Sequence, residues 1–333
     1  MSTKKTVVIA ECDHDAFDEE NAAANKGNVK LKIEQATADN LVEKCFGADG
    51  ILVQYGQITA EVMDQLPNLK AIGRYGVGVD SVDVAAATER GIVVCNVPDY
   101  GTEAVSDHAV AMALAVARGL VTLNDQVRSG TVDLSQVRPL HQVKDRIFGV
   151  VGLGRIGLAT ARKAAGLGYR VVGWEKLSTP GSVWQGVETV SLEELLRISQ
   201  VVSLHIPLSE ENRHIIGEAE LAIMRSDAII VNTARGGLIA MDPLVAALQE
   251  RRLAGAAIDC HEIEPLPADH PLVSLPNVVL SPHFAWYSEE SYGELKRRTA
   301  EGVIDVVNGI EPQNPVNPEV LANLDLEKRK ELS

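Results

Sequence analysis

Positive charge, cysteine and long apolar runs are all scarce in this chain, and each shortage excludes a class of protein. The 333 residues carry a formal net charge of -15. Nucleic acid and anionic membranes are therefore not expected as partners, because both would repel the average surface. The cysteines lie far apart and form no C-x-x-C pair, which predicts reduced, mostly buried thiols and no metal site. The four are Cys12, Cys45, Cys95 and Cys260.

No apolar run approaches the roughly 20 residues of a membrane span. The N-terminal MSTKKTVVIAEC passes into a strand and then into acidic sequence instead of a signal-peptide core, so we expect a cytoplasmic protein. Apolar residues make up 46% of the chain and charged residues 23%, as in a globular protein with large cores. The length suits two domains of roughly 100 to 200 residues each.

The first hundred residues alternate short apolar strands with helix-like stretches, a pattern that predicts a parallel sheet covered by helices. We expect strands at Thr6–Ala10, Gly50–Val53, Lys70–Arg74 and Gly91–Cys95, and helices at 38–46, 59–66 and 84–90.

Two loops at the carboxyl ends of these strands are candidate ligand sites. One reads QYGQ and spans Gln54 to Gln57, and the other reads RYGVGVD. In the second loop Gly76 and Gly78 expose successive backbone N–H groups, which can hold a carboxylate. An ordinary glycine turn is the alternative interpretation.

A strand, a glycine turn and a helix follow one another in RIFGVVGLGRIG and LATARKAAGLG. Gly152 permits the tight turn, Gly154 lets the backbone approach a pyrophosphate, and Gly157 lets the helix pack close to the strand. The first helical residues, Arg155 and Ile156, lie where free N–H groups and the helix dipole favour phosphate. This pattern predicts a dinucleotide site.

A second strand, Tyr169–Trp174, is followed directly by Glu175, which lies 23 residues after Gly152. This is close to the spacing of about 20 at which an acidic side chain meets the ribose hydroxyls. Because its charge should repel a 2′-phosphate, Glu175 favours NAD (NADH) over NADP, although Lys176 follows it directly.

The stretch from Thr102 to about Arg128 predicts one long helix that is apolar all round and therefore buried on several sides. After Glu175, strand and helix units repeat, with a capping box at Ser191 and a helix capped by Asp242, with Pro243 at its first position. These units predict a doubly wound sheet with a dinucleotide fold. An amphipathic helix over 288–309 could return the chain to the first domain.

Three polar side chains follow predicted strands of the second domain, namely Arg235 in NTARGG, Glu264 in DCHEIEP and His283 in SPHFAWYS. Each alone could be an ordinary surface residue. Together they place a guanidinium, a carboxylate and an imidazole where open α/β sheets bind ligands. Arginine can hold a 2-oxo acid, histidine can protonate the developing alkoxide, and a carboxylate favours the protonated imidazole. The set predicts hydride transfer at a carbonyl, with the hydride chemistry belonging to a nicotinamide.

From about residue 50 to about 310, GLGRIG, NTARGG, the D-x-H-x-x-E-P run and SPH resemble the D-isomer-specific 2-hydroxyacid dehydrogenase family in order and spacing. The resemblance implies that Arg235, Glu264 and His283 are catalytic. It also implies that Thr233 and Asp259 bind the cofactor, with Asp259 at the nicotinamide amide. The backbone of Gly76, Val77 and Gly78 would hold the substrate carboxylate.

With this resemblance we expect an α/β fold of two doubly wound parallel-sheet domains with a cleft between them. A Rossmann NAD-binding domain would span 101–285, and a discontinuous, flavodoxin-like substrate domain would span 1–100 plus 286–333. Members of the family are usually homodimers built through the cofactor domains, and the substrate would be a small 2-oxo or 2-hydroxy acid. Phosphoglycerate enzymes of the family carry arginines where this chain has Gln54 to Gln57. The absence of those arginines, with Tyr55 and Trp286 expected to bind the substrate, indicates an uncharged substrate side chain.

Within the family, DCHEIEP and PHFAWYSEES look most like the C-terminal binding proteins, corepressors that retain the dehydrogenase fold. The expected function is an NAD-dependent D-2-hydroxyacid dehydrogenase, or 2-oxo acid reductase. The alternative is an NAD(H)-sensing regulatory protein of the corepressor type with vestigial catalysis. Formate or phosphite oxidation on the same fold stays open, as does the identity of the oxo acid. Trp286 could also be a packing aromatic at the hinge.

Overall fold

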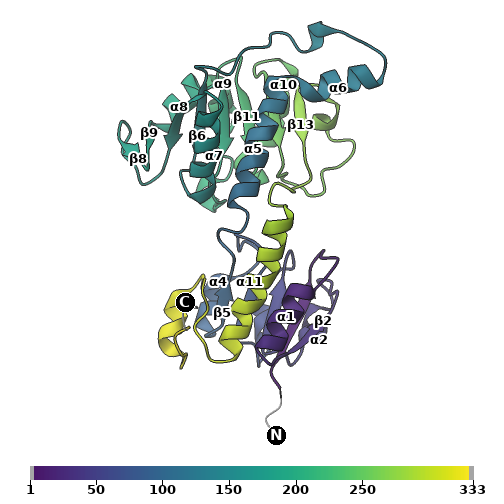
Figure 1. The fold of residues 1–333 in the computed structure, drawn as a ribbon, viewed down its shortest axis with the longest axis vertical. Helices are drawn as coiled ribbons and strands as arrows, with labels where there is room; N and C mark the ends of the chain where they lie inside the picture. The colour runs from purple at the N-terminus through teal and green to yellow at the C-terminus, as the bar shows by residue number, and fades with distance from the viewer. Residues whose placement is uncertain (1–3, 330–333) are drawn as a thin grey trace. The chain divides into compact units, whose positions relative to one another are not determined.

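The computed structural model describes residues 4–329, and their contacts divide the chain into two compact units. Unit 1 is formed by the two ends of the chain, up to Tyr100 and from Ser288, and unit 2 is Gly101–Tyr287. Each unit contains a largely parallel sheet with helices on both faces (Figure 1). The expected α/β class with two doubly wound sheets is confirmed.

Unit 1 contains a five-stranded sheet in the order β2-β1-β3-β4-β5, with every pair parallel. This is the flavodoxin-like order. The strands are β1 (Thr6–Glu11), β2 (Lys30–Ile33), β3 (Gly50–Val53), β4 (Ala71–Arg74) and β5 (Val93–Cys95).

Helices cover both faces of this sheet. On one face lie α1 (Asp18–Lys26) and α11 (Glu289–Val307), and on the other lie α2 (Leu41–Cys45), α3 (Ala60–Asp64) and α4 (Val84–Glu89). Helix α11 packs so closely on β4 that a Cβ at Gly73 would lie 2.7 Å from a methyl group of Val303. The predicted amphipathic helix therefore does join the N-terminal sheet.

Unit 2 contains an eight-stranded sheet in the order β13-β12-β11-β10-β6-β7-β9-β8. Apart from the antiparallel β8–β9 pair, its strands are parallel, and β6 to β12 follow the Rossmann order. The strands are β6 (Ile147–Val151), β7 (Arg170–Trp174), β8 (Val183–Trp184), β9 (Val187–Thr189), β10 (Val201–Leu204), β11 (Ile229–Asn232), β12 (Gly255–Ile258) and β13 (Val278–Leu280).

Two buried apolar clusters cover the faces of this sheet. On one face lie α5 (Thr102–Ala117) and α7 (Arg155–Gly166), and on the other lie α8 (Leu192–Ile198), α9 (Glu218–Ile223) and α10 (Met241–Gln249). The side chain of Ser191 caps α8 by accepting from the Glu194 N–H at 3.1 Å, as its sequence predicts.

Two expectations about local structure are wrong, and two elements were not expected. The single helix from Thr102 to Arg128 is two helices, α5 and α6 (Leu120–Arg128), because Gly119 adopts a left-handed φ of 59° and bends the chain by 63°. Helix α10 begins after Ala240, whose extended backbone precedes Met241, so Asp242 and Pro243 lie inside its first turn. Helix α1 and strand β2 were not expected, because alanine is the only apolar residue type in α1 and β2 is only four residues long.

Within residues 4–329, no single helix has the length and apolar character to cross a membrane, and only the bent pair α5 and α6 passes that test by length and composition. All four cysteines are buried and free.

Candidate active site

The predicted catalytic residues of unit 2 follow three strands that lie side by side. Strands β11, β12 and β13 are adjacent and parallel, so their carboxyl ends share one edge of the sheet. Arg235 follows β11, Glu264 follows β12 and His283 follows β13. Strand order therefore brings together three loops that are far apart in the sequence.

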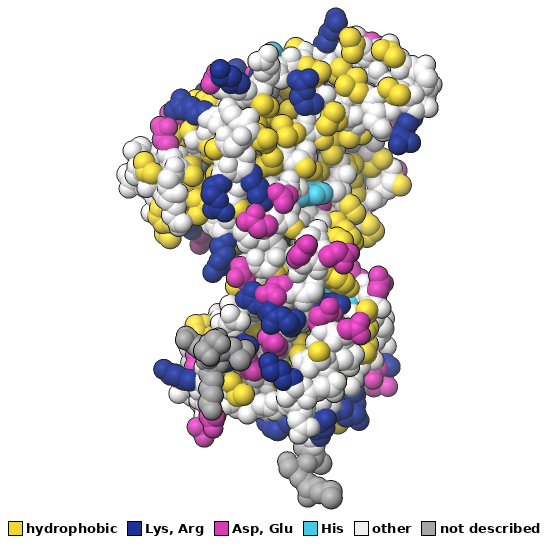
Figure 2. Space-filling model, in the orientation of Figure 1, with side chains coloured by type: hydrophobic (Ala, Val, Ile, Leu, Met, Phe, Trp, Pro, Cys, Tyr) yellow, Lys and Arg dark blue, Asp and Glu magenta, His cyan; other side chains and the backbone are white. Residues whose placement is uncertain are grey.

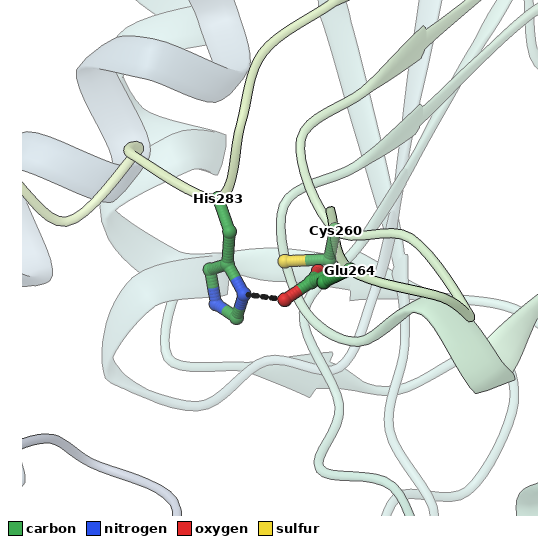
Figure 3. A group of neighbouring side chains, drawn as sticks. All are labelled: Cys260, Glu264 and His283. Carbon is green, nitrogen blue, oxygen red and sulfur yellow. Dashed lines mark hydrogen bonds and ion pairs between the residues drawn. The ribbon is translucent and has the colours of Figure 1, made fainter. Parts of the chain in front are cut away.

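His283 and Glu264 form a direct pair, with 2.8 Å between His283 Nδ1 and Glu264 Oε2 (Figure 3). Because an ionised carboxylate only accepts hydrogen bonds, this contact assigns the hydrogen to Nδ1 and leaves Nε2 for a ligand. Both side chains are about one-third exposed, so a small molecule can reach them. His283 adopts a left-handed φ of 58°, unusual for a residue other than glycine.

The Glu264 carboxylate is held ionised by its surroundings. Burial is the largest single influence and raises the pKa of this carboxyl, but the hydrogen bond and charge of His283, together with the His261 N–H that donates to Oε1 at 2.8 Å, outweigh it. The net pKa of Glu264 is lower than its ordinary value. Glu264 is thus suited to stabilise a protonated imidazole.

Arg235 lies in a loop that requires glycine beside it. A Cβ at Gly236 would lie 2.0 Å from the backbone carbon of His261, so the loop after β11 packs directly against the loop after β12. The Arg235 carbonyl accepts from Asn232 Nδ2 at 2.8 Å, and Arg235 Nη1 donates to the carbonyl of Ala234 at 2.8 Å. This packing explains the R-G-G sequence and holds the guanidinium at the same edge as Glu264.

Asp259 has a position that sequence reasoning did not foresee. Its carboxylate is fully buried and accepts from Ser281 Oγ at 2.5 Å and from the backbone N–H groups of Phe284 and Ala285 at 3.0 and 3.1 Å. Its carbonyl accepts from the His283 N–H at 2.8 Å. The loop that carries His283 is therefore wrapped around Asp259, and a contact with the nicotinamide stays a prediction.

Cys260 is a further member of the cluster that sequence reasoning missed, although it stands between Asp259 and His261 at the end of β12. One ligand atom each of Cys260, Glu264 and His283 lie within 4.8 Å of one another, a possible metal-binding group (Figure 3). Burial, followed by the charge of Asp259, raises the pKa of this thiol well above its ordinary value. A metal would have to displace that proton, and we assign no metal role to the cluster.

The predicted cofactor residues form a strand, turn and helix. Gly152 has a φ of 95°, and a Cβ at Gly157 would lie 1.9 Å from the carbonyl oxygen of Gly152, so both positions require glycine. At Gly154 a Cβ would point into open space, which leaves the backbone accessible to a pyrophosphate at the N-terminus of α7. Arg155 and Ile156 begin that helix, and Arg155 is exposed.

Two more residues at this edge suit a dinucleotide. Glu175 follows β7 and accepts from the Leu153 N–H at 2.9 Å, which ties its carboxylate to the glycine turn. The hydroxyl of Thr233, after β11, is buried without a hydrogen-bond partner, and a buried hydroxyl in this state needs a ligand or water. The exposed Lys176 pairs with Glu211 at 2.9 Å. The residues present therefore fit a dinucleotide.

The predicted substrate residues are divided between the units. Tyr55 and the Gly76, Val77 and Gly78 loop belong to unit 1, at the carboxyl ends of β3 and β4. The Tyr55 hydroxyl donates to Asp13 at 3.1 Å. Trp286 belongs to unit 2, where its ring contacts those of Phe284 and Tyr287 at centroid distances of 5.8 and 5.7 Å.

Comparison with known proteins places this site in a family. Residues 110–285 match the family model described as "D-isomer specific 2-hydroxyacid dehydrogenase, NAD binding domain". A glyoxylate reductase of Korarchaeum cryptofilum (strain OPF8) is 42% identical over 269 residues, which cover 79% of this chain and 81% of that protein. A D-3-phosphoglycerate dehydrogenase of Methanocaldococcus jannaschii is 38% identical over 296 residues, covering 88% and 55% of the two chains.

Among solved structures, a glyoxylate reductase from Paecilomyes thermophila superimposes with a TM-score of 0.85 at 27% identity, covering 95% of this chain and 99% of that one. Apart from the phosphoglycerate dehydrogenase, these relatives are glyoxylate reductases and not corepressors, which corrects the expected closeness to the C-terminal binding protein branch. The chain belongs to the D-isomer specific 2-hydroxyacid dehydrogenase family and is an NAD(P)-dependent oxidoreductase of that family.

Proposed function

We propose that the protein reduces small 2-oxo acids, glyoxylate among them, to D-2-hydroxy acids with NADH. The observation that carries this proposal is the 2.8 Å pair of His283 and Glu264 at the strand edge that also presents Arg235. The glyoxylate reductases among the relatives support the choice of substrate.

Each of the three side chains has one task in this reaction. The planar guanidinium of Arg235 binds the substrate carboxylate and polarises the carbonyl oxygen. When bound, the nicotinamide supplies the hydride. His283 donates a proton from Nε2 to the developing alkoxide, and the ionised Glu264 stabilises the imidazolium and fixes the ring through Nδ1.

The glycine turn and Glu175 hold the cofactor and select its type. The N–H groups at the start of α7 receive the pyrophosphate beside Gly154, where a Cβ would meet nothing. The buried hydroxyl of Thr233 is available to hydrogen-bond the dinucleotide. The Glu175 carboxylate accepts from the ribose hydroxyls and repels a 2′-phosphate, whereas Lys176 is engaged with Glu211. We therefore expect NADH to be preferred.

An oxo-acid panel tests the proposal. The relative kcat/KM is measured for glyoxylate, hydroxypyruvate, 3-phosphohydroxypyruvate and larger apolar 2-oxo acids, with NADH and with NADPH. We expect turnover of the uncharged substrates with NADH, because the loop from Gln54 to Gln57 contains no cation for a phosphate. A preference for the phosphorylated acid would favour the activity of the phosphoglycerate relative. Tight NADH binding without turnover of any acid would contradict the proposal.

We also propose that two copies associate through unit 2. Exposed apolar side chains gather on helix α6 and the segment after it, and hydrophobic side chains cover much of the face of unit 2 drawn in Figure 2. They are Leu120, Val121, Val127, Val132 and Leu134. A cavity of about 540 Å³ lies beside them, at the amino ends of the sheet strands, with Val137, Pro139 and Pro276 in its wall.

An exposed apolar segment next to a cavity of mixed polar and apolar lining suits a symmetric pair in which each segment contacts the other copy. Sedimentation velocity should show a dimer. A Val127→Glu/Val132→Glu variant should dissociate, whereas Val183→Glu, at an exposed valine of strand β8, should not. A monomeric wild-type protein would contradict the proposal.

A further inference from the structure

A buried carboxylate in unit 1 contacts the residue that precedes the Gly76, Val77 and Gly78 loop. Glu20, in the first turn of α1, is 0% exposed, and the Tyr75 hydroxyl donates to its Oε1 at 3.0 Å. Tyr75 is itself only 2% exposed. Burying a carboxylate costs folding free energy unless its oxygens are paired. The burial of Glu20 therefore indicates a role for this side chain other than stability.

His14 completes the packing around Tyr75. Its side chain is fully buried, with Nδ1 3.4 Å from Glu20 Oε1. Its ring meets Tyr75 edge to face at a centroid distance of 4.5 Å and meets Tyr292 at 5.1 Å. The Tyr75 ring is therefore held at its hydroxyl by Glu20 and along its side by His14.

The loop that follows is held at its carbonyl groups. The Gly76 carbonyl accepts from the Val97 N–H at 3.1 Å, and the Val77 carbonyl accepts from Asn96 Nδ2 at 2.6 Å. In a planar trans peptide the N–H points opposite to the carbonyl. The N–H groups of Val77 and Gly78 therefore both point away from residues 96 and 97.

The first residue of the loop cannot be altered without strain. Gly76 has a φ of 146°, and a Cβ there would lie 1.5 Å from Arg74 Nη1. The loop is thus fixed by Tyr75 on one side, by the carbonyl hydrogen bonds on the other, and by the guanidinium of Arg74 against Gly76.

We propose that Glu20 is a positioning residue for the substrate, which acts through Tyr75 to aim the N–H groups of Val77 and Gly78 at the substrate carboxylate. This inference rests on the proposed function. Its effect falls on binding of the carboxylate substrate and spares coenzyme binding and proton transfer, because the glycine turn, His283 and Glu264 all belong to unit 2.

The test compares Glu20→Ala, Tyr75→Phe and the double variant with the control Glu19→Gln. Glu19 neighbours Glu20 but pairs with Lys296 at 2.6 Å instead of Tyr75. The readouts are the KM for glyoxylate, kcat, the Kd of NADH, and the Kd of the unreactive carboxylate oxamate in the presence of NADH. A merely destabilised enzyme loses active molecules and hence apparent kcat, whereas its KM stays the same.

We expect the KM for glyoxylate and the Kd of oxamate to rise about tenfold in each single variant, as for loss of one buried hydrogen bond. The double variant should be no worse than either single variant, because both remove the same bond. The kcat, the NADH Kd and the control should change by less than about twofold. Glu20→Gln, which keeps an acceptor oxygen, should recover part of the loss.

An unchanged KM and oxamate Kd in Tyr75→Phe would overturn the inference, and so would an equal loss of NADH affinity. Tyr75→Phe keeps the buried ring and decides the question if Glu20→Ala does not fold. A wild-type enzyme that binds oxamate but reduces no oxo acid contradicts the proposed function alone, and the oxamate Kd values of the variants still decide the role of Glu20.

Discussion

The loops at the carboxyl ends of the two sheets expose different kinds of chemical group. In unit 2 the loops after β11, β12 and β13 present charged side chains, with His283 and Glu264 2.8 Å apart. In unit 1 the loop after β4 presents backbone N–H groups, with Arg74 and Asn96 against the loop and with Glu20 and His14 buried behind Tyr75.

This difference separates two tasks. A proton donor has to be an exposed titratable side chain whose charge is controlled by a partner. A carboxylate can be held by N–H groups, which keep their direction as long as the chain around them is rigid. Substitutions at the unit 2 edge should therefore change the rate, and side-chain substitutions in the unit 1 loop should change little.

The largest effect is expected for His283→Ala. Without a proton donor at this edge, kcat for glyoxylate should fall by about 10²- to 10⁴-fold, the range for loss of general acid catalysis. The Kd of NADH should stay the same, because the glycine turn and Glu175 lie elsewhere on the sheet. Stopped-flow turnover and fluorescence titration with NADH measure both quantities, and near-normal turnover would remove His283 from the mechanism.

A change in pH dependence is expected for Glu264→Gln. The lowered pKa of Glu264 keeps it ionised, and that charge favours the protonated imidazole. The amide lacks the charge, so the high-pH limit of the kcat/KM profile for reduction should move to lower pH. Full pH profiles of kcat/KM test this, and an unmoved upper limb would contradict the role of Glu264.

The pairing of Glu264 with His283 also makes the stability of the fold depend on pH, and the direction of that dependence follows from the pKa of Glu264. Because the pKa of Glu264 is lower in the folded protein than its ordinary value, its pairing stabilises the fold above that value. This contribution is lost as the pH falls through the folded pKa. The difference in thermal stability between wild type and Glu264→Gln should therefore shrink below about pH 4.5.

A smaller effect is expected for Asp259→Asn. An amide nitrogen in place of Oδ1 or Oδ2 would face a backbone N–H of Phe284 or Ala285, so the His283 loop should loosen. We expect kcat to fall roughly tenfold, with NADH affinity retained. A large loss of NADH affinity would instead favour the nicotinamide contact that the family resemblance implies.

Much of this arrangement follows from sequence because it depends on local rules. The glycine turn can be recognised in the sequence, because Gly152 needs a positive φ and Gly157 permits close packing. The break at Gly119 was missed because the apolar pattern continues on both sides of it. Local spacing contains no sign of a left-handed residue when hydrophobicity does not change.

The buried polar contacts could not be predicted from the sequence. Glu20 lies in a short helix rich in polar residues, and its bond to Tyr75 spans 55 positions in the chain. Asp259 likewise contacts residues 22 to 26 positions away. Sequence periodicity reports which face of an element is apolar, whereas such contacts depend on how separate loops meet in three dimensions.

The smallest effect is expected for Val77→Ala, which tests the unit 1 side of the comparison. The Val77 side chain is 38% exposed, whereas its N–H and carbonyl belong to the loop described above. Alanine keeps both backbone groups, so KM and kcat for glyoxylate should change by less than about twofold. Gly76→Ala is the matched contrast, because its Cβ would collide with Arg74 at a φ that alanine rarely adopts. A tenfold KM increase in Val77→Ala would mean that the side chain itself contacts the substrate, and the contrast between the two sheet edges would then fail.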